Sequence, residues 1–284
     1  MPSSIRQQSG FAHLDELPCW QLRFGEASAV ITSYGAQVLS YQPSPGDELL
    51  WLSPQANWQQ QAIRGGIPLC WPWFGPADPA VIPDAASQPA HGFARTRHWQ
   101  LLQHQCSETF ASLTLHCIFA DLPHVTAPTE LQLDVRLSND ALQVTLRCEQ
   151  PLPQQAALHS YFRLHQLKQL SVSGLGSHYL DKVSQQEHKD GREPARLEGE
   201  TDRIYLQAGS ELLLQDADHA VYLQQSGHDS SVLWNPAAAK SRALKDVADN
   251  GYQEFVCVET ARLNWQTAPL LLTQIISRRP GSHG

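Results

Sequence analysis

Two side chains that could transfer protons stand in apolar surroundings. Glu259 ends the apolar run Phe255–Val258, where an ionised carboxylate is costly unless it has a partner or a task. His159 lies in the strand-like segment Leu158–Phe162, where burial could shift its pKa and a hydrogen bond could fix its tautomer. Both are candidates for acid–base chemistry, although a hydrogen-bonded core histidine would give the same pattern.

Two glycine-containing segments carry cations. Arg64 precedes Gly65 and Gly66, which let the backbone approach a ligand closely, and its guanidinium fork suits an anion or sugar hydroxyls. His91 and Arg95 flank a glycine turn at the predicted start of a strand. A lone histidine is more often structural than catalytic, but Arg95 beside the same turn favours a functional role.

Two further features are weaker. Asp202 stands next to Arg203, and a surface ion pair would look the same. The aromatic segment Cys70–Pro76 could form a wall on which a sugar stacks. For Trp71 and Trp73 themselves we favour a position in the core.

Net charge limits the partners of the 284-residue chain. Lys and Arg total 20 against 28 Asp and Glu, a formal charge of −8, which argues against nucleic-acid binding. An anionic ligand would therefore have to be held by local Arg or Lys. No window approaches a membrane span, and Met1–Pro18 has no apolar signal-peptide core, so we expect no membrane partner.

Cysteine and histidine spacings argue against metal sites and disulfides. The 6 cysteines form no Cys-x-x-Cys pair, and the 13 histidines form no His-Glu-x-x-His motif. Several cysteines lie in apolar alternating runs. We therefore expect reduced, buried cysteines, a cytoplasmic location and no metal.

Apolar residues with a period of two dominate the rest of the chain. They alternate with polar residues along Leu131–Leu137, and again along Leu142–Cys148 after the turn Ser138–Asp140. This pattern predicts an antiparallel hairpin with one buried face, and many similar short runs follow turn residues elsewhere. Helical signals are limited to Trp58–Ile63 and Ala237–Val247.

This organisation predicts an all-β protein, a large antiparallel β-sandwich with few short helices. No linker divides the chain, so we expect a single domain over residues 1–284 with a core at about 20–276. Long loops are expected in Pro-rich stretches such as Cys70–Asp84, and a disordered tail over Ser277–Gly284.

Six segments together resemble one family, the glucose-6-phosphate 1-epimerases or hexose-6-phosphate mutarotases. This family is a branch related to aldose 1-epimerases such as galactose mutarotase. The segments are, in family order, Arg64–Pro76, His91–Arg95, Leu158–Phe162, Thr201–Tyr205, Trp234–Pro236 and Val256–Thr260. The resemblance covers about residues 20–276 and implies a galactose mutarotase-like supersandwich.

The resemblance also implies a mechanism that needs no cofactor. His159 would be the general acid that protonates the ring oxygen, and Glu259 the general base that removes the proton of the C1 hydroxyl. The ring opens to the aldehyde, the C1–C2 bond rotates, and reclosure gives the other anomer. In this scheme His159 starts protonated and Glu259 is ionised, helped by nearby donors.

Substrate contacts follow from the same resemblance. His91 would contact the ring or its hydroxyls, Asp202 would accept from a hydroxyl, and Arg64 or Arg95 would meet the 6-phosphate. Some members have Gln before the His-Gly motif, and this chain has Ala90 there, so that contact is not carried over. The expected partner is a small-molecule hexose 6-phosphate, bound by a monomer.

Three alternatives stay open at this stage. An aldose 1-epimerase of unphosphorylated hexoses would keep the chemistry, but gives little reason for two fixed arginines in an acidic chain. A non-catalytic carbohydrate-binding sandwich would leave Glu259 and His159 without a reason. A glycosidase needs two carboxylates, such as Asp202 and Glu259, and would leave His159 without a role.

Overall fold

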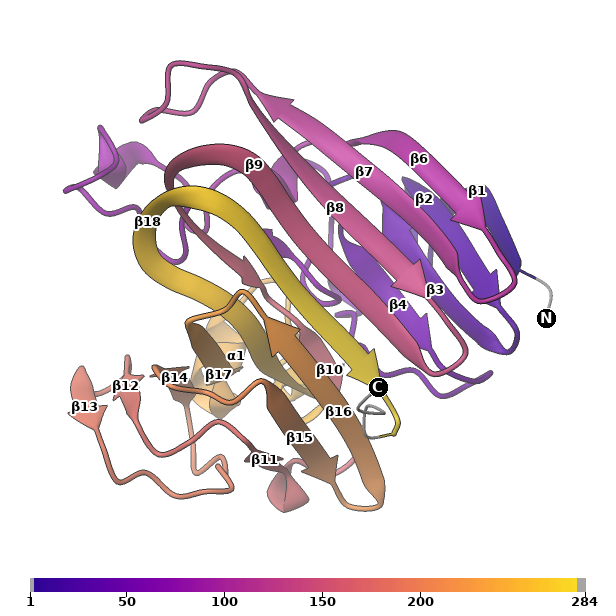
Figure 1. The fold of residues 1–284 in the computed structure, drawn as a ribbon. Coiled ribbons are helices and arrows are strands. Elements are labelled where there is room, and N and C mark those ends of the chain that lie inside the picture. Colours follow the sequence, from indigo (N-terminus) through magenta and orange to yellow (C-terminus); the bar gives the residue numbers. More distant parts are fainter. Residues whose placement is uncertain (1–2, 280–284) are drawn as a thin grey trace.

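Antiparallel strands build the molecule, as Figure 1 shows for a computed structural model that describes residues 3–279. The smaller sheet has four strands in chain order, each paired with the next. They are β1 (Ser3–Phe11), β2 (Leu14–Phe24), β3 (Ala27–Thr32) and β4 (Val38–Gln42). The predicted all-β class is confirmed. No helix of the described residues is long and apolar enough to cross a membrane.

The larger sheet has 14 strands, and its main path runs β13-β12-β14-β17-β18-β9-β8-β7-β6. The path strands are β6 (Gln100–Cys106), β7 (Ala111–Phe119), β8 (Thr129–Leu137), β9 (Ala141–Leu158), β12 (Tyr179–Asp181), β13 (Gln186–His188), β14 (Thr201–Tyr205), β17 (Ser230–Asn235) and β18 (Phe255–Ser277). Attached to it are β5 (Leu69–Cys70), β10 (Tyr161–Arg163), β11 (Ser171–Ser173), β15 (Glu211–Asp216) and β16 (His219–Ser226). The helices are α1 (Ala237–Ala243) and four 3-10 turns at Ala85–Ser87, Ala94–Thr96, Leu167–Gln169 and Gly251–Gln253.

Two long strands, β9 and β18, join the parts of the larger sheet. They pair with each other from Leu158 and Thr260 to Ala141 and Ser277, with two register irregularities on the way. The first part of β18 also pairs with β17, and its last part pairs with β16. Both strands curve strongly in Figure 1, with β18 drawn in yellow. A side chain on β18 is therefore held by strands from distant parts of the sequence.

The core lies between the two sheets. One cluster of buried side chains includes Leu22 and Ile31 from the smaller sheet together with Leu133, Val144 and Leu272 from the larger one. Strand β8 alternates buried and less buried residues along its length, as the period-two pattern predicts. Each such side chain stabilises the fold by about 1.5–3 kcal/mol relative to an exposed one.

Of the hairpin and two helices predicted from the sequence, the structure confirms the hairpin and one shortened helix. The hairpin turning at Ser138–Asp140 is confirmed, since β8 and β9 pair from Leu137 and Leu142 onward. The helix predicted at Trp58–Ile63 is wrong, because Gln60 has a positive φ of 61° that no α-helix accommodates. The helix predicted over Ala237–Val247 forms only as far as Ala243.

The disordered tail predicted over Ser277–Gly284 is wrong for Ser277 and Arg278. Ser277 is the last residue of β18, and Arg278 forms an ion pair with Asp47. Backbone pairing and this ion pair fix the segment. Residues 280–284 lie outside the described residues.

Gly66 lies where three backbone segments meet. Its N–H donates to the carbonyl of Trp51, and the next N–H, that of Ile67, donates to the carbonyl of Val38. Gly66 has φ +61°, and a Cβ added there would lie 2.1 Å from the Val38 carbonyl oxygen. A glycine is therefore required by both conformation and space.

Gly66→Ala is expected to lower the free energy of unfolding by at least about 3 kcal/mol, because it adds a backbone clash to left-handed strain. Gly46 is the matched control, since it has φ +86° but nothing within 4 Å of an added Cβ. Gly46→Ala should cost only about 1 kcal/mol. Urea denaturation of both variants makes the comparison, and equal losses would contradict the role of the close contact.

Candidate active site

Strand register places His159 opposite Glu259. Leu158 of β9 pairs with Thr260, and Tyr161 of β10 pairs with Cys257, both partners being on β18. The two pairs belong to one continuous antiparallel register, so the residue after Leu158 meets the residue before Thr260. Opposite residues in such a register project from the same face of the sheet. Two groups 100 positions apart in the sequence are thereby brought into contact.

Neighbouring strands extend this face. Asp202 of β14 pairs with Trp234 of β17, and Val232 of β17 pairs with Glu259. Lys182 follows Asp181, which pairs with Arg203, so Lys182 lies opposite Asp202. Loops that contribute Arg64, Phe74, His91 and Arg95 complete one pocket of about 240 Å³. Its lining is Arg64, Phe74, His91, Arg95, His159, Lys182, Asp202, Val232, Trp234, Lys240 and Glu259.

All six candidate residues of the sequence analysis line this pocket. Trp71 and Trp73 are fully buried, which confirms the core position favoured for them, and Phe74 is the member of that aromatic segment that lines the pocket. Sequence reasoning included Phe74 in the aromatic segment that could form a sugar-stacking wall, and gave no site role to Lys182 or Trp234. Only the successive pairing of β12 with β14, of β14 with β17 and of β17 with β18 reveals the latter two.

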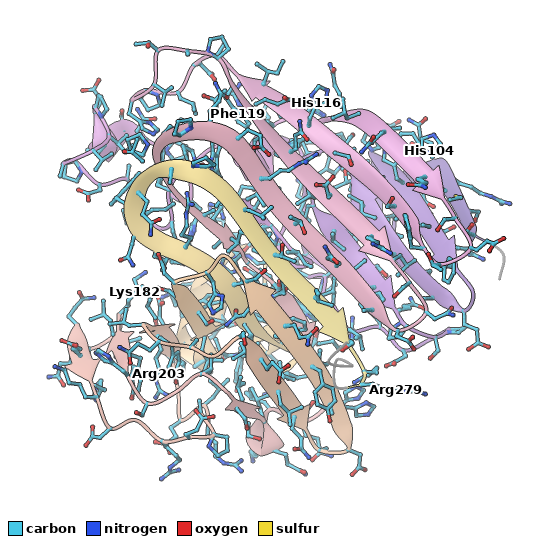
Figure 2. All side chains as sticks on the ribbon, viewed as in Figure 1. His104, His116, Phe119, Lys182, Arg203 and Arg279 are labelled. Carbon is cyan, nitrogen blue, oxygen red and sulfur yellow. The ribbon has the colours of Figure 1, made fainter. Side chains whose placement is uncertain are left out.

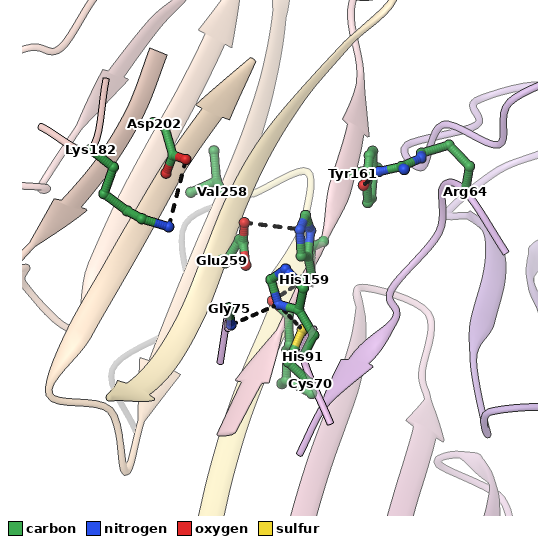
Figure 3. A network of polar contacts seen from close by, with 12 residues as sticks. Arg64, Cys70, Gly75, His91, His159, Tyr161, Lys182, Asp202, Val258 and Glu259 are labelled. Atoms are coloured by element: carbon green, nitrogen blue, oxygen red, sulfur yellow. Dashed lines mark hydrogen bonds and ion pairs between the residues drawn. The ribbon is translucent and has the colours of Figure 1, made fainter. Parts of the chain in front are cut away.

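The imidazole and the carboxylate are close but are not hydrogen-bonded to each other. His159 Nδ1 lies 3.4 Å from Glu259 Oε1 (Figure 3). His159 is 8% exposed and Glu259 1%, and His159 Nδ1 and Glu259 Oε2 have no hydrogen-bond partner among the described residues. The ring of Tyr161 stacks on that of His159, with centroids 5.0 Å apart and an interplanar angle of 8°. The histidine ring is thus fixed in orientation while its polar atoms stay available.

Burial works against the charged form of both groups. It raises the pKa of Glu259 well above its ordinary value, and the Asp202 carboxylate raises it further, whereas Lys182 and Arg95 act to lower it. Burial likewise lowers the pKa of His159, and His91, Arg95 and Arg64 add to this effect. The expected hydrogen-bond donors to Glu259 are not found in the described part of the chain. The positive charges of Lys182 and Arg95 favour the ionised carboxylate instead.

His91 sits in a strained turn with a defined tautomer. Its φ is +65°, a value uncommon for a residue other than glycine, and Gly92 follows with φ +68°. The N–H of Gly75 donates to His91 Nδ1 over 3.2 Å, and Cys70 Sγ lies 3.2 Å from the same nitrogen. Burial lowers the pKa of His91 to about 3, helped by Arg95, Lys182 and Arg64. The neutral ring therefore carries its proton on Nε2 and can donate it to a hydroxyl.

The two arginines are held differently. Arg64 Nε binds Asp246 over 3.0 Å, and Arg64 Nη1 donates to the Tyr161 hydroxyl over 2.9 Å. Figure 3 shows Arg64 on the side of Tyr161, away from Lys182 and Asp202. Arg95 is half-buried and donates through Nη2 to the carbonyl of Ala90 over 2.7 Å. Each guanidinium keeps further N–H groups for a ligand.

The pocket is locally positive. Four cations and two carboxylates line it, in a chain whose formal charge is −8. The cations are Arg64, Arg95, Lys182 and Lys240, and the carboxylates are Asp202 and Glu259. Such an arrangement suits a small ligand with an anionic group and several hydroxyls.

Metal ligands are scarce in the described part of the chain. One group, His159, Cys257 and Glu259, brings three potential donor atoms within 4.8 Å of one another. Two of its members, His159 and Glu259, line the pocket, and we assign no metal to the group. All six cysteines are free, and Cys257 is buried whereas Cys106 is exposed.

The chain is similar to known proteins over most of its length. Residues 18–272 match the family model described as aldose 1-epimerase. A proposed glucose-6-phosphate 1-epimerase of Salmonella typhimurium is 32% identical over 271 residues, which cover 92% of this chain and 87% of that protein. One of Escherichia coli K12 is 33% identical over 258 residues, covering 87% of this chain and 84% of that protein. The crystal structure of a proposed mutarotase from Salmonella typhimurium has a TM-score of 0.86 at 29% identity, covering 97% of each chain.

The acid stability of the fold should depend on His91. Because its pKa is about 3 in the folded protein and 6.5 in the reference state, the unfolded chain binds more protons between these values, and stability falls as pH decreases below 6.5. His91→Asn keeps an acceptor near the position of Nδ1 but cannot titrate. It should reduce the slope of the unfolding free energy by up to about 1.4 kcal/mol per pH unit.

Urea denaturation between pH 7 and about pH 4 measures this slope. His104→Asn is the control, because His104 is exposed on β6, on the side of the molecule away from Lys182 (Figure 2). The control should keep the slope of the parent protein. A His91→Asn slope equal to that of the control would contradict the buried, neutral state of His91.

Proposed function

The chain belongs to the aldose 1-epimerase family, and on that premise we propose that it interconverts the α and β anomers of glucose 6-phosphate. The observation that carries the proposal is the buried His159–Glu259 pair in a pocket lined by four cations. The names of the relatives support the same substrate.

Ring opening needs two proton transfers at neighbouring oxygens of the sugar. In our proposal Glu259 removes the proton of the C1 hydroxyl, and His159 protonates the ring oxygen. The bond between C1 and the ring oxygen breaks, and an open-chain aldehyde forms. Rotation about C1–C2 presents the other face of the carbonyl, and reclosure with both transfers reversed gives the other anomer.

The shifted pKa values suit these roles. Burial raises the pKa of Glu259, which makes its carboxylate a stronger base, and lowers the pKa of His159, which makes its imidazolium a stronger acid. Each charge is costly in isolation, but at 3.4 Å the two stabilise each other. Because burial disfavours both charged forms, the proposed starting state depends on this mutual stabilisation.

The rest of the pocket orients the substrate. His91 would donate from Nε2 to a ring hydroxyl, and Asp202 would accept from another. Arg64 and Arg95 would bind the 6-phosphate, since a guanidinium fork matches phosphate oxygens. Arg64 already pairs with Asp246, but Arg95 forms no ion pair among the described residues. A neutral hexose would leave the charge of Arg95 without a partner, which favours the phosphate ester over the unphosphorylated sugar.

The cysteines bear on where the protein works. All six are free, and four of them are buried. Free cysteines are typical of reducing compartments, so we propose a cytoplasmic location.

One-dimensional exchange NMR tests the activity. The protein should accelerate exchange between the α and β H1 signals of glucose 6-phosphate more than those of glucose. Glu259→Gln should lower the rate at least about 100-fold, because an amide cannot accept the proton, while sugar binding is retained. Acceleration of glucose alone would leave the acid–base pair in place and reject the phosphate specificity. Acceleration of neither sugar would favour a binding protein.

Phosphate recognition can be tested at Arg95. Arg95→Met should raise KM for glucose 6-phosphate about 10- to 100-fold, the loss expected for a charge-assisted hydrogen bond, with little change in binding of glucose. Arg97→Met is the matched control, since Arg97 is close in sequence but pairs with Asp121, outside the pocket lining. Similar KM values in both variants would show that Arg95 does not hold the phosphate.

A further inference from the structure

We propose that Lys182 is a positioning residue of the site, whose ammonium group holds Asp202 and supplies the positive charge that the Glu259 carboxylate needs to act as a base. The inference rests on the proposed function, because it concerns the same proton transfer. The family resemblance of the sequence assigns no role to this lysine.

Backbone pairing fixes where Lys182 lies. Its N–H donates to the carbonyl of Asp202 over 2.7 Å, which continues the β12–β14 register by one residue. Since opposite residues project from one face, its side chain lies on the face that carries Asp202 and Glu259. Figure 3 shows the ammonium group between the strands, directed towards Asp202 and the region of Glu259.

Side-chain contacts hold the ammonium group without using all of its donors. Lys182 Nζ lies 3.7 Å from Asp202 Oδ2, a distance of an ion pair rather than of a strong hydrogen bond. The same nitrogen lies 5.7 Å from the centre of the Phe74 ring, which packs against the His91 ring in an edge-to-face arrangement. The lysine side chain is 31% exposed, so it is ordered by its neighbours yet open to the pocket.

The other three cations of the pocket bind groups other than Asp202 and Glu259. Arg64 binds Asp246 and Tyr161, and Lys240 binds Glu200 over 2.8 Å. Arg95 donates to the carbonyl of Ala90. Lys182 alone among the four pairs with a carboxylate that faces Glu259. It therefore neutralises the repulsion that Asp202 would otherwise exert.

Groups on seven parts of the fold act on Glu259. They are His159 after β9, Asp202 on β14, Lys182 after β12, Arg95 in the 3-10 turn Ala94–Thr96, Tyr161 on β10, and the buried thiols of Cys70 on β5 and Cys257 on β18. Burial and Asp202 oppose ionisation, whereas Lys182 and Arg95 favour it. Loss of Lys182 leaves Asp202 uncompensated, so the pKa of Glu259 must rise.

Lys182→Met tests the inference through the pH profile of kcat/KM for glucose 6-phosphate. The acid limb should move up by about one pH unit, which is about a tenfold loss on that limb. Lys182→Gln should act in the same way, and Lys182→Arg should restore the limb because it restores the charge. Lys240→Met is the control: it removes a charge from the same pocket, but that charge neutralises Glu200 and not Asp202, so the limb should stay in place.

A second readout does not depend on turnover. The ionisation of Glu259 can be followed by carbon-13 NMR of its carboxyl group, assigned with Glu259→Gln, and Lys182→Met should raise the pKa of Glu259 by about the same one unit. An unmoved NMR titration overturns the inference, as does an equal shift in Lys240→Met. The parent protein could also fail to interconvert the anomers while Lys182→Met still shifts the NMR titration of Glu259. That result would retain the role of Lys182 and reject the proposed function.

Discussion

Two ionisable groups, an imidazole and a carboxylate, lie 3.4 Å apart with almost no solvent around them. In water each would be charged or neutral independently of the other. Inside the sheet each charge is costly. The carboxylate charge is favoured by the imidazolium and by the cations nearby, whereas the same cations oppose the imidazolium charge, which the carboxylate favours. The arrangement of the pocket follows from this constraint, because it has to supply compensation without filling the space that a ligand needs.

The strands meet this requirement through register. Strands β9 and β18 are long and curved, and the same pairing continues from Leu158 to Tyr161 across the short break between β9 and β10. Backbone hydrogen bonds on both sides thus fix His159 and Glu259. The loops add what strands cannot, namely close approach of backbone, and Gly66 and Gly92 occupy positions where a Cβ would meet a carbonyl oxygen.

Local charge and total charge have opposite signs in this molecule. The chain carries a formal charge of −8, yet four of the six charged residues that line the pocket are cations. Because salt screens charges over roughly 10 Å, a bound anion would respond to these neighbours more than to the distant surface. Ion pairs with Asp246 and Glu200 also hold the side chains of Arg64 and Lys240. The positions of these two positive charges at the pocket are therefore set before a ligand binds.

The sequence by itself determined the fold class and most of the site. Alternation along β8 and β9 predicts the sheet because a strand shows its buried face at every second residue, and Glu259 at the end of an apolar run indicates a buried charge. The family resemblance supplied the roles of the six candidate residues. Tertiary structure alone decided that Lys182 belongs to the site, that burial acts against both charges of the pair, and that residues 58–63 form no helix. The reason is physical: register and desolvation depend on strands far apart in the chain, and no local pattern of residues encodes which strands will meet.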